Sequence, residues 1–568
     1  MRILLVPETE RGRGSGHVRR AIHLLDEIPQ ATLFLAEADA RVLSLLTESA
    51  RGRVIDEIDA SLWDLVVLDR FSVAADELPL YADARAVVGI DVGGPGREMC
   101  DYVIDTLPRL DSSPANVSDR ALLRLPALTA PGDRAPGSVL VTYGGEDPAR
   151  LTETTVDALL GAGVPPDRIT VIVPTMRAVA SLPPGLRRFK GLPSLRDVLR
   201  ANEWVFTSFG MTAWEAANSG CRIVTVAPTP YHDRLAAQER FVRIDPGKLN
   251  ARSVRAAMSR PDDVLAASMS HAVETPRSLA GLITGLEPPA RRGSPVAGEP
   301  GRAVWRDEQR SYFRCATSSL LYMERFRADR TRYDSAYFDE DYRAQYGKSY
   351  LEDFEHIKAM GHARTERIAR RVRPPARLLD VGCAYGPFLS AANDAGYDVC
   401  GIDVGSDPVR YVNDTLGLNA VCGSILDDEA VGRLPHRQFD VVTLWYVIEH
   451  FPQLDELLHR LTGLLRPGGT LAFSTPHGRG VSARQDLRAY LDKSPGDHYT
   501  IWDRPSARRV LGSFGYRSVR FRITGHHPQR YRAVQARRLP ATLAAIDSRL
   551  RGLGDTFEVY ATKDRGNG

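Results

Sequence analysis

Short runs of apolar residues alternate along the whole chain with longer segments in which apolar positions recur every three or four residues. The short runs predict buried strands, and the longer segments predict helices that pack on one face. Such an alternation is typical of parallel α/β sheets. We therefore expect an α/β protein built from three Rossmann-like units.

Two stretches rich in Pro and Gly, residues 128–137 and 287–301, interrupt this pattern. Their composition disfavours any packed element. We expect Rossmann-like domains at residues 1–130 and 131–286, a flexible linker at 287–304, and a third Rossmann-like domain at 305–568.

The expected strands lie in short Val-, Ile- and Leu-rich runs that end before a loop or a helix. In the first two domains these are residues 2–6, 32–35, 65–68, 87–90, 138–143, 169–173, 204–207 and 222–226. In the third they are residues 378–381, 398–402, 439–444 and 470–474, with a late hairpin-like pair at 518–523 and 556–562.

Composition narrows the classes of function. The 568 residues are 43% hydrophobic and 26% charged, which is ordinary for a globular protein and excludes global disorder. The net charge is only +3, from 74 basic and 71 acidic side chains. That balance argues against a nucleic-acid partner bound through its phosphates.

The chain shows no stretch of about 18 consecutive apolar residues, so we expect no membrane span. Its apolar start, Ile3 to Val6, is followed at once by Pro7 and predicts a buried strand rather than a signal peptide. The six cysteines show neither a C-x-x-C pair nor a metal-ligand spacing. We expect reduced, mostly buried thiols, a cytoplasmic location and no metal site.

The most specific motif lies in the third domain. A strand ending at Val381 is followed by a glycine-rich turn, Gly382 to Gly386, and by the start of a helix. Amides at such a helix start bind carboxylates, and Asp403, after the next strand, is suited to accept ribose hydroxyls. A dinucleotide loop would need glycines where Ala384 and Pro387 stand, so a dinucleotide fits poorly.

The motif D-x-G-x-x-x-G spans Asp380 to Gly386 and is followed in order by Asp403, Glu449-His450 and the turn 465–469. This series of motifs resembles class I S-adenosylmethionine (SAM) methyltransferases. The resemblance covers about residues 333–563 and implies SAM as cofactor. It implies that Gly382, Cys383 and Gly386 shape the SAM loop, Asp380 faces the methionine end, Asp403 the ribose, Ser424 and Ile425 the adenine, and Tyr446 the transferred methyl.

A methyl acceptor with a hydroxyl group needs help in losing its proton, and two histidines are candidates. His450 follows the fourth strand of the domain, and His498 lies in a later loop. His450 is alternatively a packing or helix-capping residue. His498 is alternatively a substrate contact or a surface side chain.

The first domain has its own candidate site. A strand leads into the glycine-rich stretch from Gly14 to Arg20, in which His17 opens an amphipathic helix. The helix dipole disfavours a cation at that position and keeps the imidazole neutral. A neutral His17 is suited to act as a base or to polarise a diphosphate-linked group, although it is alternatively a helix cap.

The second domain offers two strand–loop–helix units, at Gly144-Gly145 and at Gly210 to Glu215. Amides at both helix starts are expected to hold a diphosphate without a metal. Glu215, one turn into its helix, is expected to take ribose hydroxyls, or else simply to favour the helix dipole.

Together these motifs resemble GT-B nucleotide-sugar enzymes, a family that includes the peptidoglycan UDP-GlcNAc transferase. They are closer to the UDP-sugar hydrolases of the pseudaminic acid pathway and to spore-coat polysaccharide proteins. The resemblance covers residues 1–286 and implies a nucleotide-sugar substrate, UDP-linked, with His17 assisting attack on the sugar. The substrate-binding residues that it implies are Gly14, Gly16, Gly144, Gly145, Gly210, Met211, Thr212 and Glu215, to which we add His232.

Two positions depart from these relatives, which carry Asn-Gln or Asp-Gln where this chain has His232-Asp233, and a pair of acids where it has Asp91-Val92.

Taken together, the motifs of both halves predict a glycosyltransferase fused to a SAM-dependent methyltransferase, both acting on a glycan or glycosylated small molecule. The alternatives are a nucleotide-sugar hydrolase fused to the methyltransferase, or a silent sugar-binding module beside it.

Overall fold

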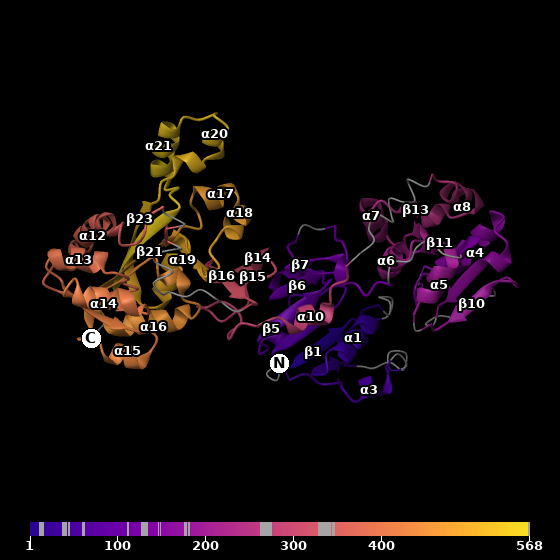
Figure 1. The fold of residues 1–568 in the computed structure, drawn as a ribbon, viewed down its shortest axis with the longest axis horizontal. Helices are drawn as coiled ribbons and strands as arrows, with labels where there is room; N and C mark the ends of the chain where they lie inside the picture. The colour runs from indigo at the N-terminus through magenta and orange to yellow at the C-terminus, as the bar shows by residue number, and fades with distance from the viewer. Residues whose placement is uncertain are drawn as a thin grey trace. The chain divides into compact units, whose positions relative to one another are not determined.

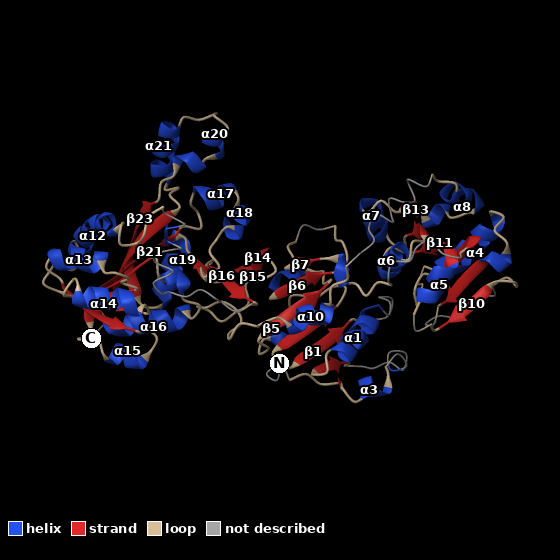
Figure 2. Ribbon diagram, in the orientation of Figure 1, coloured by secondary structure: helices blue, strands red, loops and turns tan. Residues whose placement is uncertain are grey.

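Two compact units make up the chain in this computed structural model. The structure describes residues 1–10, 16–36, 43, 46–59, 63–110, 113–126, 134–145, 147, 149–174, 179, 182–192, 194–261, 275–327, 342–343 and 347–565. The first unit contains Met1–Ala290 and Arg306–Gln309, and the second contains Arg291–Trp305 and Arg310–Gly568. Figure 1 follows the chain through both units, and Figure 2 shows strands and helices alternating in each.

A parallel seven-stranded sheet forms the first part of unit one, in the order β3-β2-β1-β4-β5-β6-β7. Its strands are β1 (Ile3–Pro7), β2 (Ala31–Phe34), β3 (Val54–Ile55), β4 (Leu65–Asp69), β5 (Ala86–Ile90), β6 (Tyr102–Asp105) and β7 (Val117–Ser118). Every residue of β1, β4 and β5 is buried, as the continuous apolar runs predict.

Helix α1 (Gly16–Glu27) buries Val18, Ala21, Ile22, Leu24 and Leu25, so its apolar stripe faces the sheet. The remaining helical elements of this part are α3 (Glu48–Arg51), η2 (Leu78–Tyr81), η3 (Pro95–Met99) and η4 (Arg120–Leu122).

A second parallel sheet, six-stranded, has the order β10-β9-β8-β11-β12-β13. Its strands are β8 (Ala135–Val141), β9 (Ile169–Val173), β10 (Arg187–Lys190), β11 (Asn202–Thr207), β12 (Arg222–Val226) and β13 (Val242–Ile244). Its helices are α4 (Leu151–Gly161), η5 (Pro166–Arg168), α5 (Arg196–Ala201), α6 (Met211–Asn218), α7 (Pro230–Gln238), η6 (Pro246–Lys248) and α8 (Ala251–Met258). The next helix, α10 (Leu279–Thr284), returns to the first sheet and contacts α1 (Figure 1).

The main sheet of unit two has seven strands in the order β19-β18-β17-β20-β21-β24-β23. They are β17 (Arg377–Val381), β18 (Asp398–Asp403), β19 (Asn419–Cys422), β20 (Phe439–Trp445), β21 (Leu465–Pro476), β23 (Tyr516–Thr524) and β24 (Thr556–Lys563). The first five run parallel, and β24 inserts antiparallel between β21 and β23. The expected late hairpin thus closes one edge of the sheet.

Helices pack on this sheet through regular apolar stripes. Helix α16 buries Leu454, Leu457, Leu458, Leu461 and Leu464, which recur every three or four residues. The helical elements of this unit are α12 (Phe354–Ala369), α13 (Pro387–Asp394), α14 (Ser406–Asp414), α15 (Asp428–Gly432), η8 (Ile448–His450), α16 (Leu454–Leu464), α17 (Val481–Gln485), α18 (Leu487–Asp492), α19 (Arg504–Ser513), η9 (Pro528–Arg530), α20 (Arg532–Gln535) and α21 (Ala541–Arg551).

A small four-stranded sheet was not among the expected elements. Three of its strands precede the main sheet in the chain, and the fourth follows β21. Its strands, in the order in which they pair, are β14 (Arg302–Arg306), β15 (Arg310–Arg314), β16 (Leu321–Arg325) and β22 (Thr500–Ile501). β16 pairs antiparallel with both β15 and β22.

The segment expected to be an unpacked linker is only partly so, and here the structure corrects the sequence. Ser294 is fully buried, and Gly293 donates its amide to Glu324 at 2.8 Å. The carbonyl of Pro295 accepts from the amide of Asp455 at 3.0 Å. The Pro and Gly residues prevent a helix or strand here, but they do not prevent an irregular segment from packing.

All six cysteines are free thiols, and five of them are buried, as the sequence predicts. Within the described residues, no helix has the length and apolar character needed to cross a bilayer.

Candidate functional site

The glycine-rich turn of unit two leaves β17 and enters α13. Gly382 has φ +70°, Ala384 has φ +46° and Gly386 has φ +77°. Three left-handed residues within five reverse the chain tightly, and only the glycines adopt that conformation without strain. Pro387 then starts the helix, where its fixed φ is favourable.

These glycines are also required by packing. A Cβ on Gly382 would lie 2.4 Å from Val447 Cγ2, and one on Gly386 would lie 2.8 Å from Val412 Cγ2. The missing side chains therefore let neighbouring parts of the chain close around the turn, in addition to shaping its backbone.

Asp403, the last residue of β18, is held against this turn. Its Oδ2 accepts from the amide of Ala384 and its Oδ1 from the amide of Gly405, each at 2.8 Å. Burial raises the pKa of Asp403 above its usual value. The two predicted features, the turn and the acid, thus meet at the carboxyl edge of the sheet.

Asp380 lies in β17 at the same edge and is 2% exposed. Thr443 donates a hydroxyl hydrogen bond to its Oδ1 at 2.6 Å, but burial dominates and raises the pKa of Asp380 to about 7. Among the described residues, neither Asp380 nor Asp403 forms an ion pair. The charge of Arg364 acts on Asp380 but does not offset its burial. Two buried carboxyl groups that form no salt bridge fit a ligand that carries positive charge and hydroxyl groups, as SAM does.

The other predicted cofactor residues lie around this edge with different surroundings. The thiol of Cys383 packs toward Gly401 in the core, so only its backbone belongs to the turn surface. Ser424 accepts the amide of Leu426 at 3.2 Å, and Ile425 is 2% exposed within the core. Tyr446, just after β20, is 42% exposed and has a left-handed φ of +61°, a strained backbone of the kind found at functional sites.

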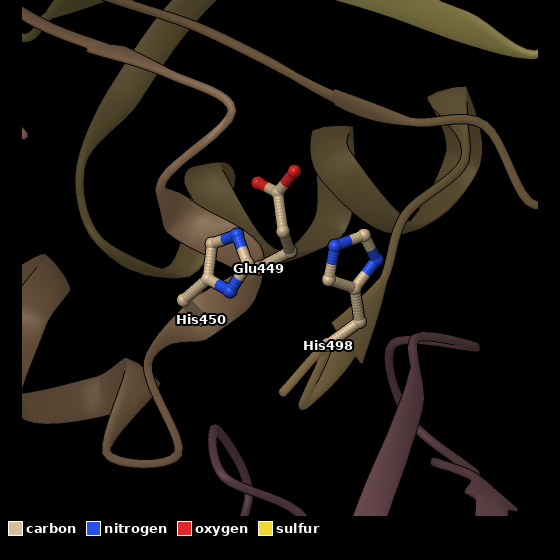
Figure 3. A group of neighbouring side chains, drawn as sticks. All are labelled: Glu449, His450 and His498. Atoms are coloured by element: carbon tan, nitrogen blue, oxygen red, sulfur yellow. The ribbon is translucent and has the colours of Figure 1, made fainter. Parts of the chain in front are cut away.

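Beyond β20 the structure brings the two predicted histidines together with Glu449 (Figure 3). The rings of His450 and His498 are 4.9 Å apart and nearly perpendicular. His450 Nδ1 lies 3.1 Å from Asp497 Oδ2. Burial alone would lower the pKa of His450, but the hydrogen bond to Asp497 and the charge of Glu449 raise it, whereas burial and the charge of His450 lower that of His498 to about 3.

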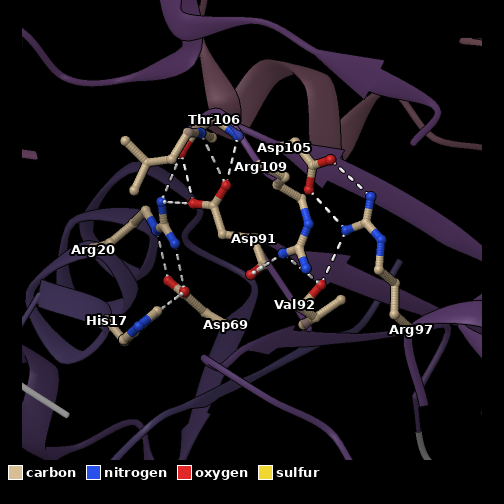
Figure 4. Close-up of polar contacts among 10 residues, drawn as sticks. His17, Arg20, Asp69, Asp91, Val92, Arg97, Asp105, Thr106 and Arg109 are labelled. Atoms are coloured by element: carbon tan, nitrogen blue, oxygen red, sulfur yellow. Dashed lines mark hydrogen bonds and ion pairs between the residues drawn. The ribbon is translucent and has the colours of Figure 1, made fainter. Parts of the chain in front are cut away.

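In unit one, His17 lies at the start of α1 and its Nδ1 is 2.6 Å from Asp69 Oδ1 (Figure 4). Asp69 is the last residue of β4 and also binds Arg20 through both of its oxygens, at 2.6 and 2.7 Å. Arg20 reaches Asp91, directly after β5, at 2.6 Å. Asp91 in turn accepts from the amide and the hydroxyl of Thr106, each at 2.7 Å.

This buried network fixes the charge of its members. Burial by itself would raise the pKa of Asp69, but Arg20 and His17 lower it to about 2. Asp69 and Asp91 together raise the pKa of Arg20, although its burial by itself would lower that pKa. Asp69 therefore stays ionised beside His17 and orients the ring.

The predicted substrate residues of unit one fall into three groups. Gly14 lies outside the described residues. Gly16 and Met211 lie close together, because a Cβ on Gly16 would be 2.7 Å from Met211 Cε. Gly144 and Gly145 form a turn after β8, in which Gly144 has φ +83° and open space around it.

A carboxylate of the chain itself caps the start of α4, where the sequence predicts a diphosphate site. Asp147 is 2% exposed, and its carboxylate accepts the amides of Leu151 and Thr152 at 2.9 and 3.0 Å. The protein's own carboxylate therefore already satisfies the amides on which a phosphate would depend.

The start of α6 differs, because Gly210 gives it no side-chain cap. Thr212 and Glu215 are partly buried on this helix, and burial raises the pKa of Glu215. His232 lies in the first turn of α7, where its Nδ1 is 2.7 Å from Thr229 Oγ1. Its burial lowers its pKa.

Sequence reasoning missed three residues of these sites. Asp69 directly follows an apolar strand, a signal equal to the one that identified Asp403. Asp497 precedes His498, but nothing in the sequence connects it with His450. Tyr350 packs against Tyr385 of the glycine-rich turn, with ring centroids 6.0 Å apart, and only the aromatic richness of its segment could have pointed to it.

Comparisons with known proteins concern unit two. Residues 354–520 match the family model of a methyltransferase domain. A ubiquinone biosynthesis O-methyltransferase from Methylococcus capsulatus is 30% identical over 145 residues, which are 24% of this chain and 56% of that protein. One from Xanthomonas campestris pv. campestris is 33% identical over 126 residues, 21% of this chain and 51% of that protein. The chain thus spans about half the length of the curated relatives it matches.

Among solved structures, a SAM-dependent methyltransferase from Archaeoglobus fulgidus is 17% identical, covers 38% of this chain and 100% of its own, and has a TM-score of 0.29. The matched family model, together with the sheet order of unit two, defines a methyltransferase domain with the class I Rossmann-like fold.

Proposed function

We propose that unit two transfers a methyl group from SAM to a hydroxyl group of a small molecule or glycan. The observation that carries the proposal is the 2.8 Å hydrogen bond from the amide of Ala384 to Asp403, which joins the glycine-rich turn and the acid after β18 in one site. The relatives named O-methyltransferases support oxygen as the acceptor atom.

Four residues of this chain would hold SAM. Asp380 faces its positively charged methionine end, Asp403 takes the ribose hydroxyls, and Gly382 and Gly386 let the backbone pass close to it. SAM supplies a methyl group on an electrophilic sulfonium, so the protein's task is alignment of the acceptor.

The acceptor hydroxyl must lose its proton as the new C–O bond forms and the S–C bond breaks, with the bonding pair staying on sulfur. The groups placed for this at the carboxyl edge are Glu449, His450 and His498. The low pKa of His498, about 3, makes it a weak base, whereas Asp497 favours protonation of His450.

Calorimetric titration of the full chain with SAM tests this proposal. We expect wild-type protein to bind SAM and Asp403→Ala to bind it at least about tenfold more weakly, because hydrogen bonds to a charged group contribute about 1.5–3 kcal/mol. Asp407→Ala, in the first turn of α14 where Asp407 is partly exposed and pairs with Arg410, is the matched control and should bind normally. Absence of SAM binding by the wild-type chain would refute the function.

We infer a second function, a nucleotide-sugar enzyme, for unit one. It is supported by two consecutive parallel α/β sheets and by the hydrogen-bonded His17–Asp69 dyad where β4 ends. Asp69 orients the imidazole, and His17 Nε2 then assists attack on the sugar by water or by an acceptor hydroxyl. Transfer and hydrolysis are distinguished by whether turnover needs an acceptor.

The test uses UDP-sugars with the full chain and mass spectrometry of the products. We expect His17→Ala to abolish sugar turnover, while His23→Ala, an exposed histidine on the same helix, leaves it intact. A UDP-sugar that raises the melting temperature without being turned over would instead indicate a sugar-binding module. Adding SAM to the same mixture shows whether both units act on one molecule, because the product then carries both sugar and methyl.

A further inference from the structure

Three side chains from two distant parts of the chain meet beyond the end of β20. Glu449 and His450 lie in η8, and His498 lies just before β22. One candidate ligand atom from each lies within 4.8 Å of the others, and Figure 3 shows the three side chains gathered together. The two segments are joined by a 2.8 Å hydrogen bond from the amide of Tyr499 to the carbonyl of Glu449.

Glu449 is the residue that needs an explanation. It is 1% exposed, and its Oε2 is fully buried with no hydrogen-bond partner in the described part of the chain. A buried carboxylate is costly unless a cation or donors compensate it.

The two histidines provide ring nitrogens that can bind a metal cation. Asp497 engages His450 through Nδ1, which sets the tautomer and directs Nε2 away, the arrangement that commonly supports a metal-binding imidazole. The ring of His498 lies 4.9 Å from that of His450 and nearly perpendicular to it, so one nitrogen of each imidazole can reach the same ion. No metal spacing is visible in the sequence, because the cluster is assembled by the fold.

We propose that Glu449, His450 and His498 form a binding site for a divalent first-row transition metal ion. Two imidazoles and one carboxylate suit Zn²⁺, Mn²⁺, Fe²⁺ or Co²⁺, and a three-residue set leaves coordination positions open for water or a substrate oxygen.

The role that we assign to the open coordination positions of the metal ion depends on the methyl transfer proposed above. The cluster follows Tyr446 at the same sheet edge as Asp380 and Asp403. An acceptor hydroxyl bound to the cation loses its proton to water more readily. Its oxygen then attacks the methyl group, and the histidines act as ligands rather than bases.

Cobalt(II) is the probe for a direct test, because its visible absorption reports nitrogen and oxygen ligands. We expect the untagged, metal-free full chain to bind Co²⁺ with an absorption band that saturates at one ion per chain. Glu449→Gln and His498→Ala should lose the band while still melting cooperatively. Asp497→Asn should weaken Co²⁺ binding by about 10-fold to 100-fold.

His436→Ala is the matched control, since His436 pairs with Asp398 at 2.8 Å on the surface, and the band should persist in it. The proposal is overturned if the wild-type chain shows no band, or if folded Glu449→Gln and His498→Ala chains keep it. A parallel SAM titration separates the two ideas. Cobalt binding without SAM binding supports the metal site and contradicts methyl transfer, and SAM binding without the cobalt band does the reverse.

Discussion

Buried carboxyl groups of this chain have sharply different surroundings. Asp69 is ionised because Arg20 and His17 compensate its burial, which lowers its pKa to about 2. Asp380 is equally buried, but among the described side chains it receives only the Thr443 hydroxyl, and its pKa rises to about 7. The first acid is therefore a fixed anion, and the second changes charge near neutral pH.

Asp380 predicts a pH dependence of stability. Its pKa in the folded chain, about 7, lies above the usual value of 3.8, so the folded state binds this proton more tightly than the unfolded state. The contribution is present at low pH and is lost as the pH rises through about 7. We expect the melting temperature of wild type to fall relative to Asp380→Asn between about pH 5 and pH 8, in melts followed by circular dichroism.

A positively charged ligand beside Asp380 would favour its ionised form. SAM binding near neutral pH should therefore release a proton, which calorimetry in two buffers of different ionisation enthalpy detects. Equal heats in both buffers, or parallel pH profiles of the two proteins, would contradict the placement of Asp380.

A site residue can be predicted from the sequence only when the feature that marks it lies nearby in the chain. Asp403 and His17 are visible because each stands beside a strand end or a glycine-rich turn. The partners Asp69, for His17, and Asp497, for His450, were missed, because pairing between residues far apart follows only from the fold. Asp147 was also missed, although it is close in sequence to the amide of Leu151 that it caps at the start of α4.

At the scale of elements, strongly patterned segments were predictable and weakly patterned ones were not. The runs at β9 and β12 have the predicted bounds, because both faces of these strands are largely buried. β15 and β16 were not expected, since arginines and other polar residues interrupt their apolar positions. These strands are buried because the small sheet packs against α18, a contact that no local sequence pattern predicts.

The turn between β17 and α13 gives an element-scale prediction. Gly382→Ala should shift the turn, because it combines a left-handed φ of +70° with a Cβ placed 2.4 Å from Val447. We expect a loss of about 1–3 kcal/mol in stability by denaturant titration, together with loss of SAM binding.

Gly463→Ala in α16 is the matched control, since that glycine is exposed and a Cβ added to it would meet no atom within 4 Å. An alanine inside a helix should stabilise the chain by about 0.5–1 kcal/mol. Equal stability of wild type and Gly382→Ala would show that the turn relaxes freely.

At the scale of the whole molecule, the division into units was predictable, but its boundary is not a single point. Arg306–Gln309 group with unit one although the residues on either side group with unit two. Arg306 is 6% exposed and donates to the carbonyls of Cys100 and Asp101 at 2.6 and 2.9 Å. The amide side chain of Asn116 donates to the carbonyl of Asp307 at 2.8 Å.

Arg306→Ala should therefore destabilise unit one. Two buried carbonyls lose their donor, and we expect a cost of about 1–3 kcal/mol. Hydrogen exchange of the amides around β6 is the measurement, with Arg302→Ala at the exposed start of β14 as the control. Unchanged exchange in Arg306→Ala would mean that these carbonyls find other donors.

This interleaving has a practical consequence. A gene cut after residue 290 would not release a self-sufficient upstream protein, because that product would lack Arg306, which donates to the buried carbonyls of Cys100 and Asp101. Transfer of residues 1–290 into another polypeptide therefore requires that Arg306–Gln309 be transferred with them or replaced.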